Sequence, residues 1–250
     1  TETDWTEVEL GVFHSCALRG DGSLWCWGGN SRGQLGTGTE DNSAVPQRVG
    51  TGTGWTGVFL GNHHTCATRT DGTLWCWGDN FSDQVGSGNA SHSNTPVNTG
   101  IDGGWVRASL GMSHTCATKT DGTLWCWGDN SSGQLGRGYT GGTGLPFQVG
   151  TGTDWAQVAL GSRHTCATKT DGTLWCWGDN SSRQFGTSTP GSSNVPLQVG
   201  TRGDWAQLSL GDRHTCATRT DGTLWCWGFN GNGQLGDGTA FVLSPRLVVR

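Results

Sequence analysis

The sequence lacks the features that mark several large classes of protein. It has no run of Lys and Arg, a formal net charge of −5 and a pI near 5.7, so the electrostatic footprint of a nucleic-acid binder is missing. No stretch is apolar for long enough to be a transmembrane helix. The short motifs of serine hydrolases, zinc peptidases and phosphate-binding loops are absent too. We therefore predict no nucleic-acid partner, no membrane span, no enzymatic activity and no cofactor.

Apolar residues are scarce, at 32%, whereas glycine is abundant, with 45 copies. Such compositions occur in disordered chains, but this chain carries 15 Trp residues, and disordered segments are poor in aromatic residues. The glycines suit tight turns that need a positive φ. The composition therefore favours a folded chain with many turns.

What the sequence contains is one unit that is repeated five times with a period of 50 residues. The string Trp25-Cys26-Trp27-Gly28 recurs in every later repeat, and His14 and Cys16 recur in step with it. A fixed period of this length marks a solenoid, a propeller or an array. We predict a single repeat domain over residues 1–250, with repeats at about 1–50, 51–100, 101–150, 151–200 and 201–250.

Each repeat has the pattern of four short strands. In the fourth repeat these are residues 155–160, 164–169, 173–177 and 195–199, the last of which is entered through a proline. No segment has a 3.6-residue apolar stripe, so we expect almost no helix. Four short strands per repeat are typical of a propeller blade, and we predict an all-β propeller of five four-stranded blades.

The cysteines form pairs across one hairpin of each repeat. A three-residue turn at Thr170-Asp171-Gly172, closed by a left-handed glycine, places Cys166 opposite Cys176. The two residues then form a non-hydrogen-bonded pair with Cα atoms about 4.5 Å apart, at the short end of the disulfide range. A zinc site is less consistent with this spacing, because one repeat offers at most three ligands. We predict no metal and five disulfides: Cys16–Cys26, Cys66–Cys76, Cys116–Cys126, Cys166–Cys176 and Cys216–Cys226. Paired cysteines favour an oxidising compartment, so we expect a secreted, extracellular protein.

The repeat resembles that of the regulator of chromosome condensation family. The resemblance is carried by Gly161-x-x-His164-Thr-x-Ala167, followed by Asp171-Gly172-x-Leu174-x-x-Trp177-Gly178-x-Asn180-x-x-x-Gln184-x-Gly186. It covers all five copies and implies a β-propeller of four-stranded blades, usually seven. The cysteines make the chain similar to secreted bacterial repeats rather than to most eukaryotic members. Nucleotide exchange on a nuclear GTPase, the family's best-known activity, suits an acidic, Cys-paired chain least well, and fold alone does not give function.

The ends of the chain suggest how the blades close. The strand at residues 5–10 opens the chain, and the strand around Pro245 ends it. We expect the C-terminal strand to pair with the N-terminal blade and so remove exposed edges. An open or oligomeric assembly is the alternative, for which the apolar run Phe241-Val242-Leu243 offers a seam.

Three recurring positions have possible structural or chemical roles. The five histidines His14, His64, His114, His164 and His214 either form a ring that binds a metal or an anion, or bond the backbone of a neighbouring blade, which we favour. Asn30 and its copies are expected to bond the following turn. Gln34 recurs in every repeat, and the residue before it is Gly in three of the five copies. This predicts a left-handed backbone at that position and hence strain at Arg183.

Function is more plausibly carried by the positions at which the repeats differ. Variable residues follow the glycine that ends each first strand, and they mix apolar, aromatic and Arg character as binding hot spots do. The candidate binding residues are Phe13, His63, Met112, Arg163 and Arg213. Ordinary variation among loops explains them equally well. We predict a secreted, non-enzymatic propeller that binds a protein or a surface glycan; the alternatives are a structural unit of an extracellular array and, least favoured, a guanine nucleotide exchange regulator.

Overall fold

The computed structural model describes residues 3–89, 91–187, 191–238 and 242–248. They form two compact units, each of which is described by itself. Unit 1 comprises residues 1–121, 127–129 and 142–147, and unit 2 comprises residues 122–126, 130–141 and 148–250. The first two repeats therefore belong to unit 1, the last two belong to unit 2, and the third contributes residues to both. The predicted single domain over residues 1–250 stays a prediction.

Every repeat supplies four short strands. The first strands are β1 (Trp5–Leu10), β5 (Trp55–Leu60), β9 (Trp105–Leu110), β13 (Trp155–Leu160) and β17 (Trp205–Leu210). The second strands are β2 (His14–Arg19), β6 (His64–Arg69), β10 (His114–Lys119), β14 (His164–Lys169) and β18 (His214–Arg219). The third strands are β3 (Leu24–Gly28), β7 (Leu74–Gly78), β11 (Leu124–Gly128), β15 (Leu174–Gly178) and β19 (Leu224–Gly228). The fourth strands are β4 (Ser43–Arg48), β8 (Ser93–Asn98), β12 (Thr143–Gln148), β16 (Ser193–Gln198) and β20 (Val242–Leu247).

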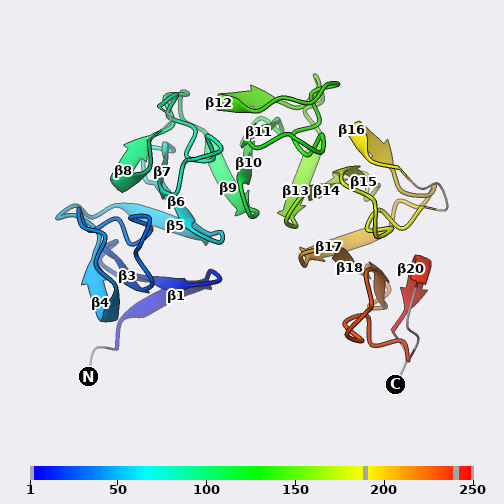
Figure 1. The fold of residues 1–250 in the computed structure, drawn as a ribbon, viewed down its shortest axis with the longest axis horizontal. Helices are drawn as coiled ribbons and strands as arrows, with labels where there is room; N and C mark the ends of the chain where they lie inside the picture. Colours follow the sequence, from blue (N-terminus) through cyan, green and yellow to red (C-terminus); the bar gives the residue numbers. More distant parts are fainter. Residues whose placement is uncertain (1–2, 90, 188–190, 239–241, 249–250) are drawn as a thin grey trace. The chain divides into compact units, whose positions relative to one another are not determined.

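The strands form five antiparallel four-stranded sheets, each with its strands in chain order and each built from one repeat. First strands of consecutive repeats lie side by side within a unit, as β1 and β5 do (Figure 1). The all-β architecture is confirmed, and no helix occurs in the described part of the chain. The described residues accordingly include no helix that is long and apolar enough to cross a membrane.

The C-terminal strand pairs within its own repeat, because β20 lies beside β19 and completes the fifth sheet. The first repeat likewise has a fourth strand of its own, β4, on β3. The expected pairing of the C-terminal strand with the first blade, and with it the closure of the five blades within one chain, stays a prediction.

The predicted hairpin register is confirmed. Cys166 lies opposite Cys176, and the same pairing holds for Cys16 with Cys26. The turn is closed by Gly172, whose φ is 75° and whose N–H donates to the Lys169 carbonyl at 2.9 Å. The Cα atoms of the four described disulfides, Cys16–Cys26, Cys66–Cys76, Cys166–Cys176 and Cys216–Cys226, are 4.1 Å apart. Cys116 and Cys126 are disulfide-bonded as well.

The predicted strand bounds shift slightly. In the fourth repeat the third strand begins one residue later, at Leu174, and the fourth strand begins two residues earlier, at Ser193. The early start has a local cause, because the Ser193 hydroxyl donates to the carbonyl of Val195 at 2.7 Å and holds the entry to the strand.

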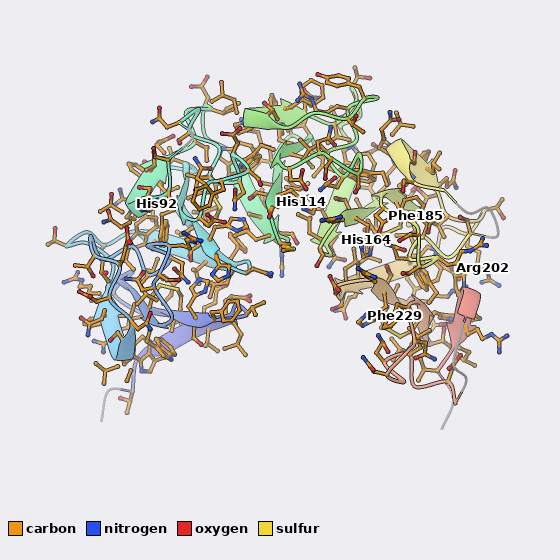
Figure 2. The ribbon with its side chains drawn as sticks, in the orientation of Figure 1. His92, His114, His164, Phe185, Arg202 and Phe229 are labelled. Carbon is orange, nitrogen blue, oxygen red and sulfur yellow. A yellow bond between two sulfur atoms is a disulfide. The ribbon has the colours of Figure 1, made fainter. Side chains whose placement is uncertain are left out.

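The hydrophobic core lies between consecutive sheets. In unit 1 the disulfide of the first repeat packs with Leu24 against Trp55, Val58 and Trp77 of the second repeat. In unit 2 the fourth repeat's disulfide, together with Leu174 and Phe185, packs against the fifth repeat in the same way; Figure 2 labels Phe185. Each repeat therefore contributes one half of a core that only its neighbour completes.

Candidate binding surface

The candidate binding residues lie in the short loop between the first and second strands of each repeat. The main chain of this loop is fixed from two sides. In the first repeat Gly11 N–H donates to the His14 carbonyl at 2.9 Å, and Gly29 N–H donates to the Phe13 carbonyl at 2.8 Å. The corresponding bonds in the second repeat run from Gly61 to His64 and from Asp79 to His63. The loop therefore presents its side chains from a rigid main chain.

Consecutive loops touch within each unit. A methyl group added at Gly11 would lie 2.7 Å from the Gly61 carbonyl oxygen, and one added at Gly61 would lie 2.9 Å from the Gly111 carbonyl oxygen. In unit 2 Ser162 N–H donates to the Asp212 carbonyl at 3.3 Å. Glycine is needed at Gly11 and Gly61 because a side chain there would push the neighbouring loops apart.

Three of the predicted residues, Phe13, His63 and Met112, form the loop row of unit 1. The rings of Phe13 and His63 stack with centroids 4.6 Å apart and an interplanar angle of 15°. Gln34 Nε2 lies 3.4 Å from His63 Nδ1. Phe13 is 54% exposed and Met112 is 48% exposed, so the row is an apolar and aromatic surface that solvent reaches.

The other two residues, Arg163 and Arg213, form the loop row of unit 2. Both side chains are exposed. Arg213 Nε lies 3.8 Å from Asp212 Oδ2, and both partners of this ion pair are largely solvated, so it contributes little to stability. The structure thus places an aromatic pair in one loop row and two guanidinium groups in the other.

Four of the recurring histidines, His14, His64, His114 and His164, are buried, and three of them are shown bonded to the next repeat. His14 Nε2 is 2.7 Å from Thr65 Oγ1, His64 Nε2 is 2.9 Å from Thr115 Oγ1, and His164 Nε2 is 3.1 Å from Thr215 Oγ1. Figure 2 labels His164, at the start of β14. The favoured interpretation was correct about the neighbouring repeat but wrong about the partner group, which is a threonine hydroxyl rather than the backbone.

The threonine hydroxyls continue the bond to the preceding repeat. Thr65 Oγ1 donates to the Gln34 carbonyl at 2.9 Å, and Trp77 Nε1 donates to the same oxygen at 2.9 Å. Since the single hydroxyl proton of Thr65 is used, His14 must donate through Nε2–H. We call this His–Thr–Gln–Trp set the inter-repeat ladder.

The environment of the ladder keeps its histidines neutral. Burial lowers the pKa of His14 to about 4 and of His64 to about 3, with the nearby histidines contributing in the same direction. Burial likewise lowers the pKa of His164 to about 4. The Nδ1 atoms of these three rings are buried without a hydrogen-bond partner, so a proton placed there would have no acceptor.

The arrangement of possible metal ligands can be checked directly. Within the described ranges, no three His, Cys, Asp or Glu side chains are grouped so that they could hold a metal ion. The Nε2 atoms of His14, His64 and His164 each face the next repeat's threonine, whereas the ring of all five histidines would span both units and stays a prediction.

Sequence reasoning missed the residue that follows the recurring Trp-Gly pair. In the second, fourth and fifth repeats it is Asp79, Asp179 or Phe229, and its N–H is bonded to the loop described above. Although burial opposes it, hydrogen bonds from Ser181 and Gln184 leave the pKa of Asp179 below its usual value. The signal was its variation among repeats at a position adjoining Gly28 and its copies. Phe241 of the apolar run lies outside the described residues, as do the side chains of Val242 and Leu243.

Comparison with known proteins agrees with this architecture. The model of the RCC1-like domain matches residues 1–250. Human WBSCR16 superposes with a TM-score of 0.86 at 22% identity over 98% of this chain and 67% of the other. Prp20p of Saccharomyces cerevisiae, whose structure was reported with its binding properties to Gsp1p and histones, gives 0.83 at 20% identity over 97% and 65%.

A third similar structure is the CRINKLY WD40 ectodomain of the Arabidopsis thaliana receptor kinase ACR4. Its TM-score is 0.52 at 20% identity, over 97% of this chain and 66% of the other. The chain therefore spans about two thirds of the length of each of these proteins. Identities this low establish the shared fold alone.

Proposed function

The chain belongs to the RCC1-like domain family. We propose that it is a secreted, non-enzymatic propeller that binds a protein or a surface glycan through its loop rows. The observation that carries the proposal is the stacking of the exposed Phe13 on the partly exposed His63, on a main chain held by hydrogen bonds. Rigid aromatic residues give contact area at a small entropic cost.

The setting of the loop rows supports a binding role. Each loop is fixed by the second strand, and that strand is disulfide-bonded to the third. A site on such rigid elements loses little conformational entropy when a partner binds. Arg163 and Arg213 add residues of the type that dominate many interfaces.

Extracellular location is proposed on two grounds. Five disulfides are typical of oxidising compartments. The similar structure from ACR4 is an ectodomain, which is consistent with a propeller of this type outside the cell. The likeness to secreted bacterial repeats belongs to the same proposal.

Binding can be tested with a printed glycan array and a phage-displayed peptide library. We would compare the parent with a variant that carries Phe13→Ser, His63→Ser, Arg163→Ser and Arg213→Ser. Truncating hot-spot residues costs about 2 kcal/mol or more, or roughly 30-fold in affinity. The matched control is Phe81→Ser, because Phe81 is 71% exposed and lies in the turn after β7, outside both loop rows.

Loss of the parent's glycan or peptide signal in the fourfold variant, with retention in the control, supports the proposal. Equal signals from parent and fourfold variant, or no signal above background from the parent, contradict it. A structural or assembly role is the second candidate, and it is favoured by the way each repeat completes the core of its neighbour.

A further inference from the structure

A pocket lies between the fourth and fifth repeats, at the strand ends opposite the loop row. Trp205 begins β17 and pairs with Arg219, which ends β18, whereas the loop row joins the other ends of these two strands. The pocket has a volume of about 210 Å³, and besides two glycines it is lined by Val199, Arg202, Trp205, Arg219, Trp225 and Pro245. All of these residues belong to unit 2.

The opening of the pocket is a property of the seam between two repeats. Trp225 is partly buried, and so are its counterparts Trp75 and Trp175. Each of these two counterparts has a further repeat after it in the chain. A following repeat therefore does not cover this position.

Arg219 packs on both tryptophans of the pocket. Its Cζ lies 4.6 Å from the ring centroid of Trp205 and 3.9 Å from that of Trp225, distances at which a cation is attracted to an aromatic ring. The side chain is only 9% exposed. Its Nε lies 3.8 Å from Asp204 Oδ1, too far for a hydrogen bond, and is buried without a hydrogen-bond partner among the described residues. Buried donors are rarely left unpaired, so an unpaired one indicates a missing acceptor.

The same position in the third and fourth repeats holds a cation that is already bonded. Lys119 Nζ donates to the Asp102 carbonyl at 2.7 Å, and Lys169 Nζ lies 3.1 Å from Asp154 Oδ2. Asp154 immediately precedes the first strand of its repeat, as Asp204 does in the fifth. The fifth repeat therefore has the carboxylate that could pair with its cation, but the pair is not closed.

Arg202 explains this difference. It stands where the second and fourth repeats have Gly52 and Gly152, and its Nη1 donates to Asp204 Oδ2 at 2.9 Å. The carboxylate is thus engaged by Arg202, which leaves Arg219 without a close acceptor. Figure 2 labels Arg202.

The wall of the pocket combines positive charge with apolar groups. Arg202 and Arg219 both line it, and the described lining includes no carboxylate. Asp204 and Asp221 are each bonded elsewhere, to Arg202 and to Thr223. A ligand in the pocket therefore meets two guanidinium groups and no like charge for an anion in its wall.

We propose that this pocket binds a carboxylate attached to a six-membered ring, the chemistry that an acidic sugar residue and an aromatic acid share. Guanidinium groups bond carboxylates through paired N–H donors, which Arg219 and Arg202 supply. Val199, Trp225 and Pro245 form the apolar wall on which the ring packs. The volume suits a single ring, since an engineered cavity of about 150 Å³ holds benzene.

The test is a calorimetric titration of the whole chain at low salt with glucuronate and benzoate, and with their neutral counterparts glucose and benzyl alcohol. We expect the two acids to bind and the neutral compounds not to bind. Arg219→Gln should weaken binding by about tenfold or more, because hydrogen bonds to a charged group are lost. Arg202→Gly should weaken it too, since it removes one guanidinium group and frees Asp204 to pair with Arg219, as Asp154 pairs with Lys169.

Arg213→Gln is the matched control. The side chains of Arg202 and Arg213 are 60% and 59% exposed, and each lies beside an aspartate, but Arg213 belongs to the loop row. The variant should keep the parent's affinity for both acids. The same comparison separates this pocket from the proposed binding role of the loop rows, because the failure of either one leaves the other result unchanged.

The two acids distinguish the sources of the carboxylate. Tighter binding of glucuronate assigns the pocket to an acidic sugar, and tighter binding of benzoate assigns it to an aromatic acid. The proposal is overturned if neither acid binds at millimolar concentrations, if the neutral compounds bind equally well, or if Arg219→Gln and Arg202→Gly keep the parent's affinity. Equal weakening by Arg213→Gln also overturns it, because net charge alone would then explain the effect.

Folding of each variant is checked by circular dichroism against the parent. If Arg219→Gln fails to fold, Arg219→Lys replaces it, since the fourth repeat carries Lys169 at this position. Lys lacks the paired donors of a guanidinium, so this variant should also bind both acids more weakly than the parent. An unchanged affinity in Arg219→Lys and in Arg202→Gly would overturn the proposal.

Discussion

His63 and His64 are neighbours in sequence with opposite environments. His64 is fully buried and bonded to Thr115 of the next repeat, whereas His63 is partly exposed and stacks on Phe13 of the previous repeat. One belongs to the ladder and the other to the loop row. The difference teaches that a single residue step, from the end of the loop to the start of β6, separates the positions that hold the repeats together from those available to a partner.

The largest effect should come from removing the disulfide of the second repeat, whose His64 belongs to the ladder. Cys66→Ala with Cys76→Ala should lower the free energy of unfolding by about 2–3 kcal/mol, because the unfolded chain gains the entropy of a short open loop. Urea unfolding monitored by Trp fluorescence measures the change. Thr73→Ala, in the same hairpin but on its exposed turn, is the control and should cost less. Equal urea midpoints for the double variant and the parent would show that the Cys66–Cys76 disulfide does not stabilise the repeat that carries the ladder.

The two neighbouring histidines should differ strongly on truncation. His64→Ala should cost about 2 kcal/mol, because it creates a buried cavity and leaves the Thr115 hydroxyl without its donor. His63→Ala should cost less than about 1.5 kcal/mol, the usual contribution of an aromatic pair. Thermal unfolding of both variants measures the contrast.

A conservative variant sharpens this result. His64→Gln keeps an N–H donor, so it should recover part of the stability that His64→Ala loses. Similar losses for His63→Ala and His64→Ala would show that the division between ladder and loop row is wrong.

Acid should act on the ladder before it acts on the carboxylates. The pKa values of His14 and His164 are lowered to about 4 by burial, whereas an unfolded histidine titrates near pH 6.5. Between about pH 6.5 and 4 the unfolded chain binds more protons, so stability is full above pH 6.5 and falls as the pH decreases. Each such histidine contributes up to about 1.4 kcal/mol per pH unit.

The pH dependence is measured by urea unfolding at several pH values. His64→Gln should reduce the slope by one proton, since burial also lowers the pKa of His64. Phe81→Ala removes no titratable group and should keep the slope. If the free energy of unfolding depends on pH equally steeply in His64→Gln and the parent, the ladder histidines do not cause the loss of stability in acid.

Much of the fold follows from local signals in the sequence. The period of 50 residues sets the repeat, and the spacing of Cys166, Gly172 and Cys176 sets the hairpin register that the structure confirms. The Asn prediction also holds, since Asn30 Oδ1 accepts the N–H of Leu35 at 2.9 Å. These features depend on contacts within about ten residues of chain, which turn chemistry determines.

The contacts between repeats were harder to predict. His14 and Thr65 are 51 residues apart, and no local rule selects a threonine hydroxyl over a backbone group. The stacking of Phe13 on His63 likewise needs two loops from different repeats. The sequence pattern also shows where strands such as β20 begin but not which further edge they meet, so the closure of the blades stays a prediction.

The smallest effect concerns the turn that supplies the ladder's acceptor carbonyl. Arg183 precedes Gln184 and has a φ of 64°, as Gly33 has a φ of 75° before Gln34, so the predicted left-handed backbone is confirmed. The turns are alike, since Arg183 N–H donates to Asn180 at 3.0 Å and Gly33 N–H donates to Asn30 at 2.9 Å. A left-handed conformation costs a residue with a side chain about 1–2 kcal/mol, while glycine costs about 0.5–1 kcal/mol in unfolded-state entropy.

Arg183→Gly should therefore raise the free energy of unfolding by less than about 1 kcal/mol. Ser182→Gly, one residue earlier and without a positive φ, is the control and should lower it, because only the entropic cost applies there. Chemical denaturation of the two variants beside the parent measures both signs. If both glycines destabilise, the turn tolerates Arg183 without strain; if only Ser182→Gly does so, the ladder imposes the left-handed turn on every repeat, whichever residue the sequence places there.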